Sequence, residues 1–286
     1  MKKILVPIDF SSTSKNAANY AAVVAKQLKA EIILMHAYIE PLATGDLPVV
    51  SISFEELKKA VDEQLVKIEN ELITKHGKDI VISSITKIGF VFEEIKDTVE
   101  KNNIDLIVMG ITGAGKFSEL LIGSNATRVV HLLKCPVFIV PPEGRFTQIK
   151  NIAFACDYNQ LEESKAVDKL VEFVKLFNAK LMIVNISNDL KKPAQPKELA
   201  GVLLEYIFEN VDESLDIPDN VDYSVYKIKD EDIVHGINNF VDKHKADLLV
   251  MIPRKHNLLS TLFNESNTKK MAFHTHVPLL ALHEEQ

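Results

Sequence analysis

The sequence has few cysteines, no long apolar run and no cluster of positive charge, and each absence excludes a class of protein. Its only cysteines are Cys135 and Cys156, so it has no disulfide framework of the kind found in small secreted domains. No stretch of about 18 apolar residues is present, and the first apolar run ends at Asp9. We therefore expect neither a transmembrane helix nor a secretory signal, and a reducing cytoplasm as the location.

The charge balance argues against a nucleic-acid-binding protein. The chain holds 33 Lys and Arg against 40 Asp and Glu, which gives a formal net charge of −7. Binding to nucleic acid or to an anionic membrane needs clustered positive charge, and the sequence has no Lys- or Arg-rich run. We expect neither nucleic acid nor a membrane as a partner.

An internal duplication organises the chain. Its 286 residues suit about two domains, and Asp105–Met109 (DLIVM) matches Asp247–Met251 (DLLVM) at an offset of 142 residues. Two prolines and a glycine within residues 141–144 stop any helix or strand from running between the copies. We interpret the chain as two tandem domains, residues 1–142 and 148–286.

Within each half, short apolar runs alternate with amphipathic segments. In the first half, runs rich in β-branched residues predict buried strands at residues 4–8, 32–35, 81–87, 106–109 and 137–140. Helical spacing of apolar residues predicts helices at 17–28, 54–76, 90–102 and 126–133. Strands that alternate with helices pair in parallel through right-handed crossovers. Each half is therefore predicted to be an α/β domain with a doubly wound, five-stranded parallel sheet.

A glycine-rich segment follows the predicted fourth strand. Doubly wound sheets bind ligands beyond the carboxyl ends of their strands, where the strand order reverses. The first and fourth strands flank this reversal, so we expect Asp9 to lie near the segment Gly110–Asn125, GITGAGKFSELLIGSN. Gly110 and Gly113 are expected to let the chain turn sharply and to expose N–H groups to an anion. Ser124 then opens a helix, whose free N–H groups and dipole favour phosphate.

Two other interpretations of this segment remain to be weighed. In the first, the glycines only shape a strand-to-helix loop, and spacing alone leaves that alternative open. Gly110, Gly115 and Lys116 also match the start of the P-loop motif G-x-x-x-x-G-K-[ST]. The eighth position of that motif supplies a hydroxyl to magnesium, and here it is Phe117. Gly123 also interrupts the helix that should follow at once, so the P-loop is the poorer interpretation.

The spacing Gly-x2-Gly-x9-Gly-Ser, from Gly110 to Ser124, resembles the ATP-binding signature of universal stress proteins. Val6–Ser11 resembles that family's first strand and turn, and Lys134–Val137 its entry to the last strand. The resemblance covers nearly all of residues 1–142 and, more weakly, 150–283. It implies an adenine nucleotide alpha hydrolase-like fold with an adenine nucleotide site.

The resemblance also implies which residues line that site. By matching positions, Pro7, Ile8 and Asp9 flank the adenine and ribose, and Ala37 meets the base through its backbone. The phosphate-lining positions are Met109, Gly110, Thr112, Gly113, Gly123, Ser124, Asn125 and Ala126. ATP, with or without Mg²⁺, is the implied ligand.

The second half keeps the scaffold and loses the signature. At the offset of 142 residues, its three glycines are replaced by Ile252, Lys255 and Glu265. These side chains would fill the space where phosphate oxygens approach the backbone. A Glu265 carboxylate about 4 Å from a phosphate would also repel it by about 4 kcal/mol at an effective dielectric constant of about 20. We expect no nucleotide in the second half.

The sequence does not point to a metal site or to catalytic residues. His274 and His276 share a face only on a strand, and no Cys, Asp or Glu lies beside them at ligand spacing. Hydrolysis of ATP needs a positioned water, a base and usually magnesium. Asp9 is the one carboxylate that we place near the site, where contact with ribose or a metal is its expected role.

These observations lead to a first interpretation and two alternatives. We interpret the chain as a cytoplasmic regulatory protein that binds ATP in its first domain; its role in stress responses comes from the resemblance alone. A slow ATP hydrolase and a nucleotide-free interaction scaffold remain open. Single-domain relatives pair through their last strands, so the resemblance implies pairing of Val137–Val140 with Leu279–Leu282 inside one chain. A homodimer also remains open.

Overall fold

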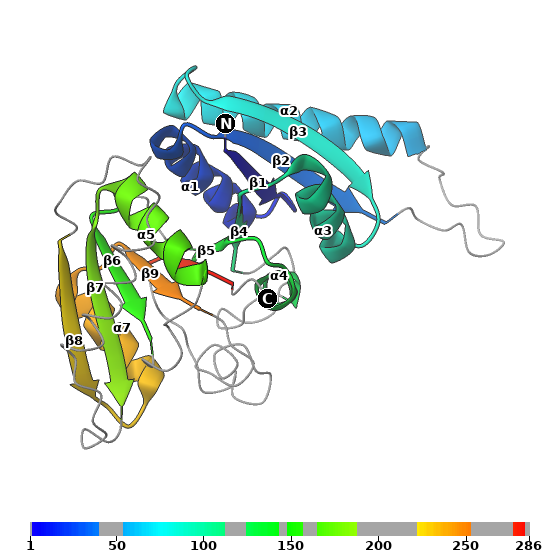
Figure 1. Cartoon of the computed structure of the whole chain (residues 1–286). Helices are drawn as coiled ribbons and strands as arrows, with labels where there is room; N and C mark the ends of the chain where they lie inside the picture. The colour runs from blue at the N-terminus through cyan, green and yellow to red at the C-terminus, as the bar shows by residue number, and fades with distance from the viewer. Residues whose placement is uncertain are drawn as a thin grey trace. The chain divides into compact units, whose positions relative to one another are not determined.

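A computed structural model describes residues 2–39, 54–111, 124–142, 148–156, 165–187, 222–252 and 277–283 (Figure 1). The described residues up to Pro142 form one compact unit, and those from Gln148 onward form a second. No helix within these ranges is both long enough and apolar enough to cross a membrane.

The first unit is a parallel sheet with the strand order β3-β2-β1-β4-β5. Its strands are β1 (Lys3–Pro7), β2 (Glu31–Tyr38), β3 (Val81–Ile88), β4 (Leu106–Gly110) and β5 (Val137–Val140). Its helices are α1 (Ser12–Leu28), α2 (Phe54–His76), α3 (Val91–Asn102) and α4 (Ser124–Leu132). Helix α1 packs on α2, and α3 packs on α4. Right-handed crossovers place the two helix pairs on opposite faces of the sheet.

Local chemistry sets the ends of α1. Ser11 is the N-cap, and its Oγ accepts a hydrogen bond of 3.1 Å from the N–H of Ser14. The helix ends at Lys29, whose φ of 50° is left-handed and whose N–H bonds back to the carbonyls of Ala25 and Lys26. Alanines at half of the buried positions let α1 lie close to the sheet.

The strand order reverses between β1 and β4, as predicted. Strand β1 pairs with β2 on one side and with β4 on the other, with Ile4 opposite Leu106. Strand β3 lies beyond β2, and β5 lies beyond β4. The carboxyl ends of β1 and β4 therefore mark the position where this fold binds ligands.

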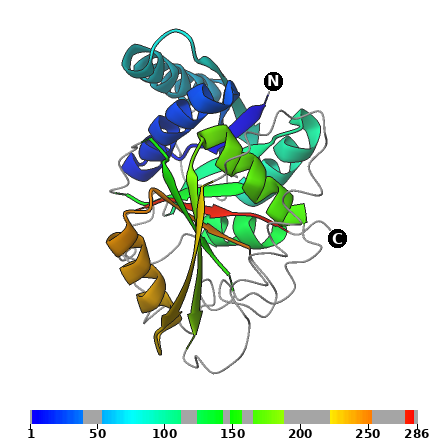
Figure 2. The ribbon, with the colours of Figure 1, turned by 60° about the vertical axis from the view of Figure 1, so that its left-hand side comes forward.

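The second unit repeats the first. Its strand order is β10-β9-β6-β7-β8, the same order in its own numbering. The strands are β6 (Asn151–Ala155), β7 (Lys180–Ser187), β8 (Tyr223–Lys229), β9 (Leu248–Met251) and β10 (Leu279–Ala281). Helices α5 (Lys165–Phe177) and α7 (Ile233–His244) lie on opposite faces of this sheet (Figures 1 and 2). Ile152 lies opposite Leu248, as Ile4 lies opposite Leu106, so the predicted duplication extends to the register.

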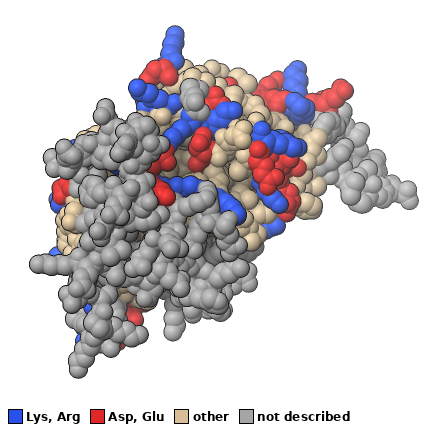
Figure 3. All heavy atoms as spheres, in the orientation of Figure 1, with Lys and Arg blue, Asp and Glu red and all other residues tan. Residues whose placement is uncertain are grey.

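Charges of both signs alternate over the described surface of the first unit (Figure 3). Several lysines and arginines lie next to acidic partners: Lys58 is 2.5 Å from Asp62, and Lys101 is 2.6 Å from Asp97. Such exposed pairs contribute little to stability, but they leave the drawn face without a broad basic area among its described residues.

Candidate functional site

Predicted adenine-side residues and the start of the predicted phosphate segment lie at the carboxyl edge of the first sheet. Strand β1 ends at Pro7, which lies opposite Met35 of β2. Strand β1 also pairs with β4, with Leu5 opposite Ile107, so the strand ends at Pro7 and Gly110 lie at the same edge of the sheet. Residues that the sequence separates by about 100 positions are thus neighbours at the point of strand reversal.

The turn after β1 is fixed by its own hydrogen bonds. Asp9 Oδ1 accepts from the N–H of Ser11 at 3.1 Å and from its hydroxyl at 2.5 Å. The N–H of Asp9 lies 3.4 Å from Ser14 Oγ. These contacts join the Asp9 carboxylate to the start of α1 and fix the shape of the turn.

Ala37 turns its backbone toward the end of β1. The carbonyl of Met35 accepts from Ile8, on the β1 side, and the carbonyl of Tyr38 accepts from Gly89, on the β3 side. Because backbone groups alternate along a strand, the N–H and C=O of Ala37 point toward β1. Strand β1 has already ended at Pro7, so these groups face the edge where the sequence places the base.

Gly110 has a different role from the one expected. The prediction of a sharp turn at this residue is wrong, because Gly110 is the last residue of β4 and pairs with Val140 of β5. A Cβ at this position would lie 2.6 Å from Cγ2 of Thr13 and 3.1 Å from the Thr13 backbone. Glycine is therefore required because the first turn of α1 packs directly on the end of β4.

The described part of helix α4 runs from Ser124 to Leu132 and contains the predicted residues Asn125 and Ala126. Ser124 and Asn125 are exposed, whereas Ala126 is buried. Arg128 of this helix contacts α3 through a cation–π interaction, with its guanidinium 4.0 Å from the Phe92 ring centroid.

Three of the predicted phosphate-lining residues lie outside the described residues: Thr112, Gly113 and Gly123. The P-loop alternative rests on positions in the same segment. The structure thus describes the residues predicted to contact adenine and ribose, and the residues at both ends of the phosphate segment.

Two aromatic residues at this edge were not singled out from the sequence. The His36 ring centroid lies 4.6 Å from that of Phe10, and His36 Nδ1 is 2.7 Å from the carbonyl oxygen of Ile8. Phe10 has a φ of 64°, which a bulky side chain rarely adopts. No pattern in the sequence indicated that the His36 imidazole reaches across to the residue after the neighbouring strand.

The corresponding edge of the second unit is filled by a larger side chain. Strand β6 pairs with β9 as β1 pairs with β4, and Ile252 follows Met251 of β9 as Gly110 follows Met109 of β4. Ile252 is half-buried there. The replacement of Gly110 predicted from the sequence offset therefore falls on the equivalent position of the fold. Lys255, Glu265, Ser266 and Asn267 lie outside the described residues.

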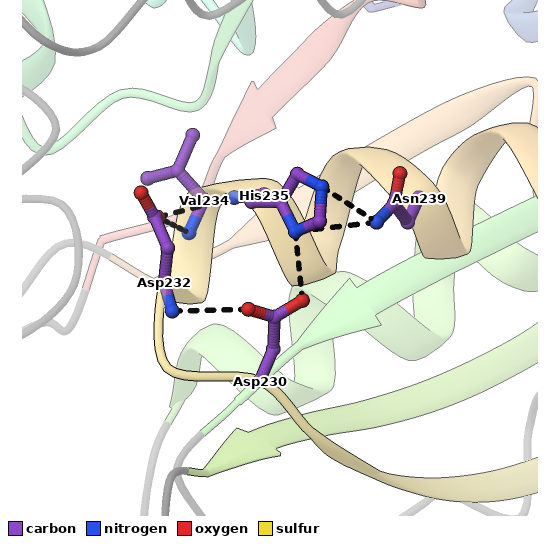
Figure 4. A network of polar contacts seen from close by, with 5 residues as sticks. All are labelled: Asp230, Asp232, Val234, His235 and Asn239. Carbon is purple, nitrogen blue, oxygen red and sulfur yellow. Dashed lines mark hydrogen bonds and ion pairs between the residues drawn. The ribbon is translucent and has the colours of Figure 1, made fainter.

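A capping network closes the start of α7 at the same edge of the second unit (Figure 4). Asp232 is the N-cap, and its Oδ1 accepts from the N–H groups of Val234 at 2.9 Å and His235 at 3.2 Å. Asp230 accepts from the Asp232 N–H at 3.0 Å and pairs with His235 Nδ1 at 2.8 Å. The His235 hydrogen bond is the main cause that lowers the pKa of Asp230. This stabilising contribution is present above the ordinary pKa of 3.8 and is lost as the pH falls through the lowered value.

Substitution of Asp232 tests this network. Asp232→Ala is expected to destabilise the second unit by about 1 kcal/mol, because two N–H groups at the start of α7 lose their acceptor. Glu231→Ala removes the same charge one residue earlier and serves as the control. Hydrogen exchange of α7 peptides should accelerate in Asp232→Ala alone; equal exchange in both variants would refute the capping role.

Among the described residues, no group of three His, Cys, Asp or Glu side chains could hold a metal ion. His274 and His276, the pair considered from the sequence, lie outside them. The described residues at this edge include backbone groups of β2, the Asp9 carboxylate and the N-terminus of α1.

Comparison with known proteins identifies the relatives. The model of the universal stress protein family matches residues 1–141 and again residues 148–283. Universal stress protein MJ0531 of Methanocaldococcus jannaschii is 34% identical over 144 residues, which cover 49% of this chain and 81% of the relative. Universal stress protein Slr1230 of Synechocystis is 23% identical over 305 residues, covering 98% of this chain and 99% of the relative.

A solved structure shares the whole architecture. The crystal structure of a universal stress protein from Archaeoglobus fulgidus aligns with a TM-score of 0.69 at 19% identity. The alignment covers 99% of this chain and 97% of that one. At this level of identity the likeness concerns the fold, and it extends over both halves.

Proposed function

Because this chain is a tandem two-domain member of the universal stress protein family, we propose that it is a regulatory protein that binds ATP in its N-terminal domain. The observation that supports the proposal is the strand reversal, where β1, which ends at Pro7, pairs with β4, which ends at Gly110. The site takes the adenine and ribose beside the turn after β1 and the phosphates at the start of α4.

The chemistry of each part supports this assignment. The Ala37 backbone offers one donor and one acceptor toward the base position. The Asp9 carboxylate stands where a ribose hydroxyl would donate to it. The N–H groups at the start of α4, together with the backbone of the glycine signature, complement phosphate charge. Mg²⁺ would accompany the phosphates as their counter-ion.

We infer a binding rather than a catalytic role. Oδ1 of Asp9 is engaged by Ser11 through two hydrogen bonds, and this geometry suits a fixed acceptor better than a base that must collect a proton from water. Bound ATP links the turn after β1 to the phosphate segment and favours one arrangement of both. Family membership supports a role in stress adaptation, and the cytoplasm is its proposed location.

The test is mass spectrometry of the small molecules released when freshly purified protein is denatured. About one ATP or ADP per chain is expected, because one domain keeps the signature. A yield rich in ADP would make turnover worth assaying. A preparation free of nucleotide that also gives no calorimetric response to ATP with magnesium would overturn the proposal and favour the scaffold alternative.

A further inference from the structure

The turn after β1 is held in an unusual shape by a side chain from the next strand. His36 Nδ1 lies 2.7 Å from the carbonyl oxygen of Ile8, immediately before Asp9. A carbonyl oxygen only accepts hydrogen bonds, so Nδ1 carries the proton and donates it. The imidazole also lies against the ring of Phe10, at 4.6 Å between centroids and an interplanar angle of 37°.

The backbone conformation of Phe10 requires support from its surroundings, such as the contacts made by His36. Its φ of 64° is left-handed, and non-glycine residues in this region persist only where their surroundings hold them. The turn is fixed on one side by Ser11 and Ser14, through the contacts of Asp9. His36 holds it from the other side, through the Ile8 carbonyl and the Phe10 ring.

The second domain contains the same hydrogen bond with another donor. Asn185 Nδ2 donates to the carbonyl of Cys156 at 2.9 Å. The backbone register is also shared, since Ile8 donates to Met35 at 2.8 Å and Cys156 to Val184 at 3.0 Å. In both domains, a side chain of the second strand therefore donates a hydrogen bond to the carbonyl of the residue after the first strand. In the second domain the donor is an asparagine.

We propose that His36 is a positioning residue of the nucleotide site: it sets the Ile8–Phe10 turn so that Asp9 and the Ala37 backbone face the same ligand. The inference rests on the proposed ATP site and adds a residue to it that acts through the backbone, without contact to the nucleotide. Asn185 occupies the equivalent position in the second domain and donates the equivalent hydrogen bond. The substitution His36→Asn therefore gives the first domain the same kind of donor.

ATP titrations of the wild type, His36→Ala and His36→Asn test the inference. His36→Ala is expected to weaken affinity roughly five- to tenfold, because the Ile8 carbonyl loses its donor and the turn loosens. His36→Asn is expected to recover part of this loss and to fall between the other two, since it restores the donor but not the ring contact. Equal affinity of His36→Ala and the wild type, or of the two variants, would overturn the inference.

A second measurement does not depend on the variants folding. Nitrogen-15 NMR of the wild-type imidazole, at a pH where the ring is neutral, is expected to show His36 protonated on Nδ1. Protonation on Nε2 would remove the hydrogen bond and with it the inference. If the wild type bound no ATP, the proposed function would fail whatever the tautomer; if it bound ATP and His36→Ala bound equally well, the role of His36 alone would fail.

Discussion

Gly113→Lys is expected to abolish ATP binding, with an affinity loss of at least about 100-fold, or ~2.7 kcal/mol. The substitution copies Lys255, which occupies the same position of the signature in the second domain. The reason is steric: a side chain at this position fills the space through which phosphate oxygens reach backbone N–H groups. The positive charge of lysine does not replace those donors. Isothermal titration with ATP and Mg²⁺ measures the loss.

A matched variant separates this steric effect from the added charge. Ala114→Lys places the same side chain one residue later, at a position where the signature requires no glycine. It is expected to bind ATP within about threefold of the wild type. Surface substitutions away from special positions usually change the free energy by no more than about 0.5 kcal/mol. Unchanged binding by Gly113→Lys, or equal losses in both variants, would contradict the assignment of the phosphate segment.

Gly110→Ala is expected to destabilise the first domain by about 1–3 kcal/mol, the usual cost of overpacking. The new Cβ would lie 2.6 Å from Thr13 Cγ2, and 3.1 Å from the carbonyl carbon and oxygen of Thr13. A β-branched side chain in the first turn of a helix has little freedom to move aside. Urea denaturation read by hydrogen exchange of β4 peptides measures the effect, with β9 peptides of the second domain as the internal reference.

The double variant Gly110→Ala/Thr13→Ala tests whether the contact with Thr13 causes the loss. Removal of Cγ2 relieves the closest contact and leaves the backbone contacts at 3.1 Å, so partial recovery is expected. The coupling energy of the cycle should be about 0.5–3 kcal/mol in the stabilising direction. Additive effects of the two substitutions would mean that Gly110 is required for another reason.

The sequence predicted the elements well where a pattern was strong and local. The helix Phe54–His76 was recognised from its long amphipathic stretch, and the strand Val137–Val140 was located to the residue from a short apolar run rich in β-branched residues. The strand order followed from alternation and handedness. The offset of 142 residues also led to the correct equivalence of Gly110 and Ile252.

What could not be predicted depends on contacts between distant segments. Gly110 was expected to serve a turn, and only the packing of Thr13 on β4 reveals its role. The hydrogen bond of His36 to the Ile8 carbonyl likewise joins residues 28 positions apart on neighbouring strands. No periodicity or motif encodes such contacts, because they arise from the register of the assembled sheet and the direction of individual side chains.

The most direct test of the central claim is calorimetric titration of ATP with Mg²⁺ into the nucleotide-free full chain. A site intact in the first domain and lost in the second predicts a stoichiometry close to one ATP per chain. A stoichiometry near two would show that the second domain binds despite its substituted signature, and no binding would contradict the proposed ATP site and favour the nucleotide-free scaffold.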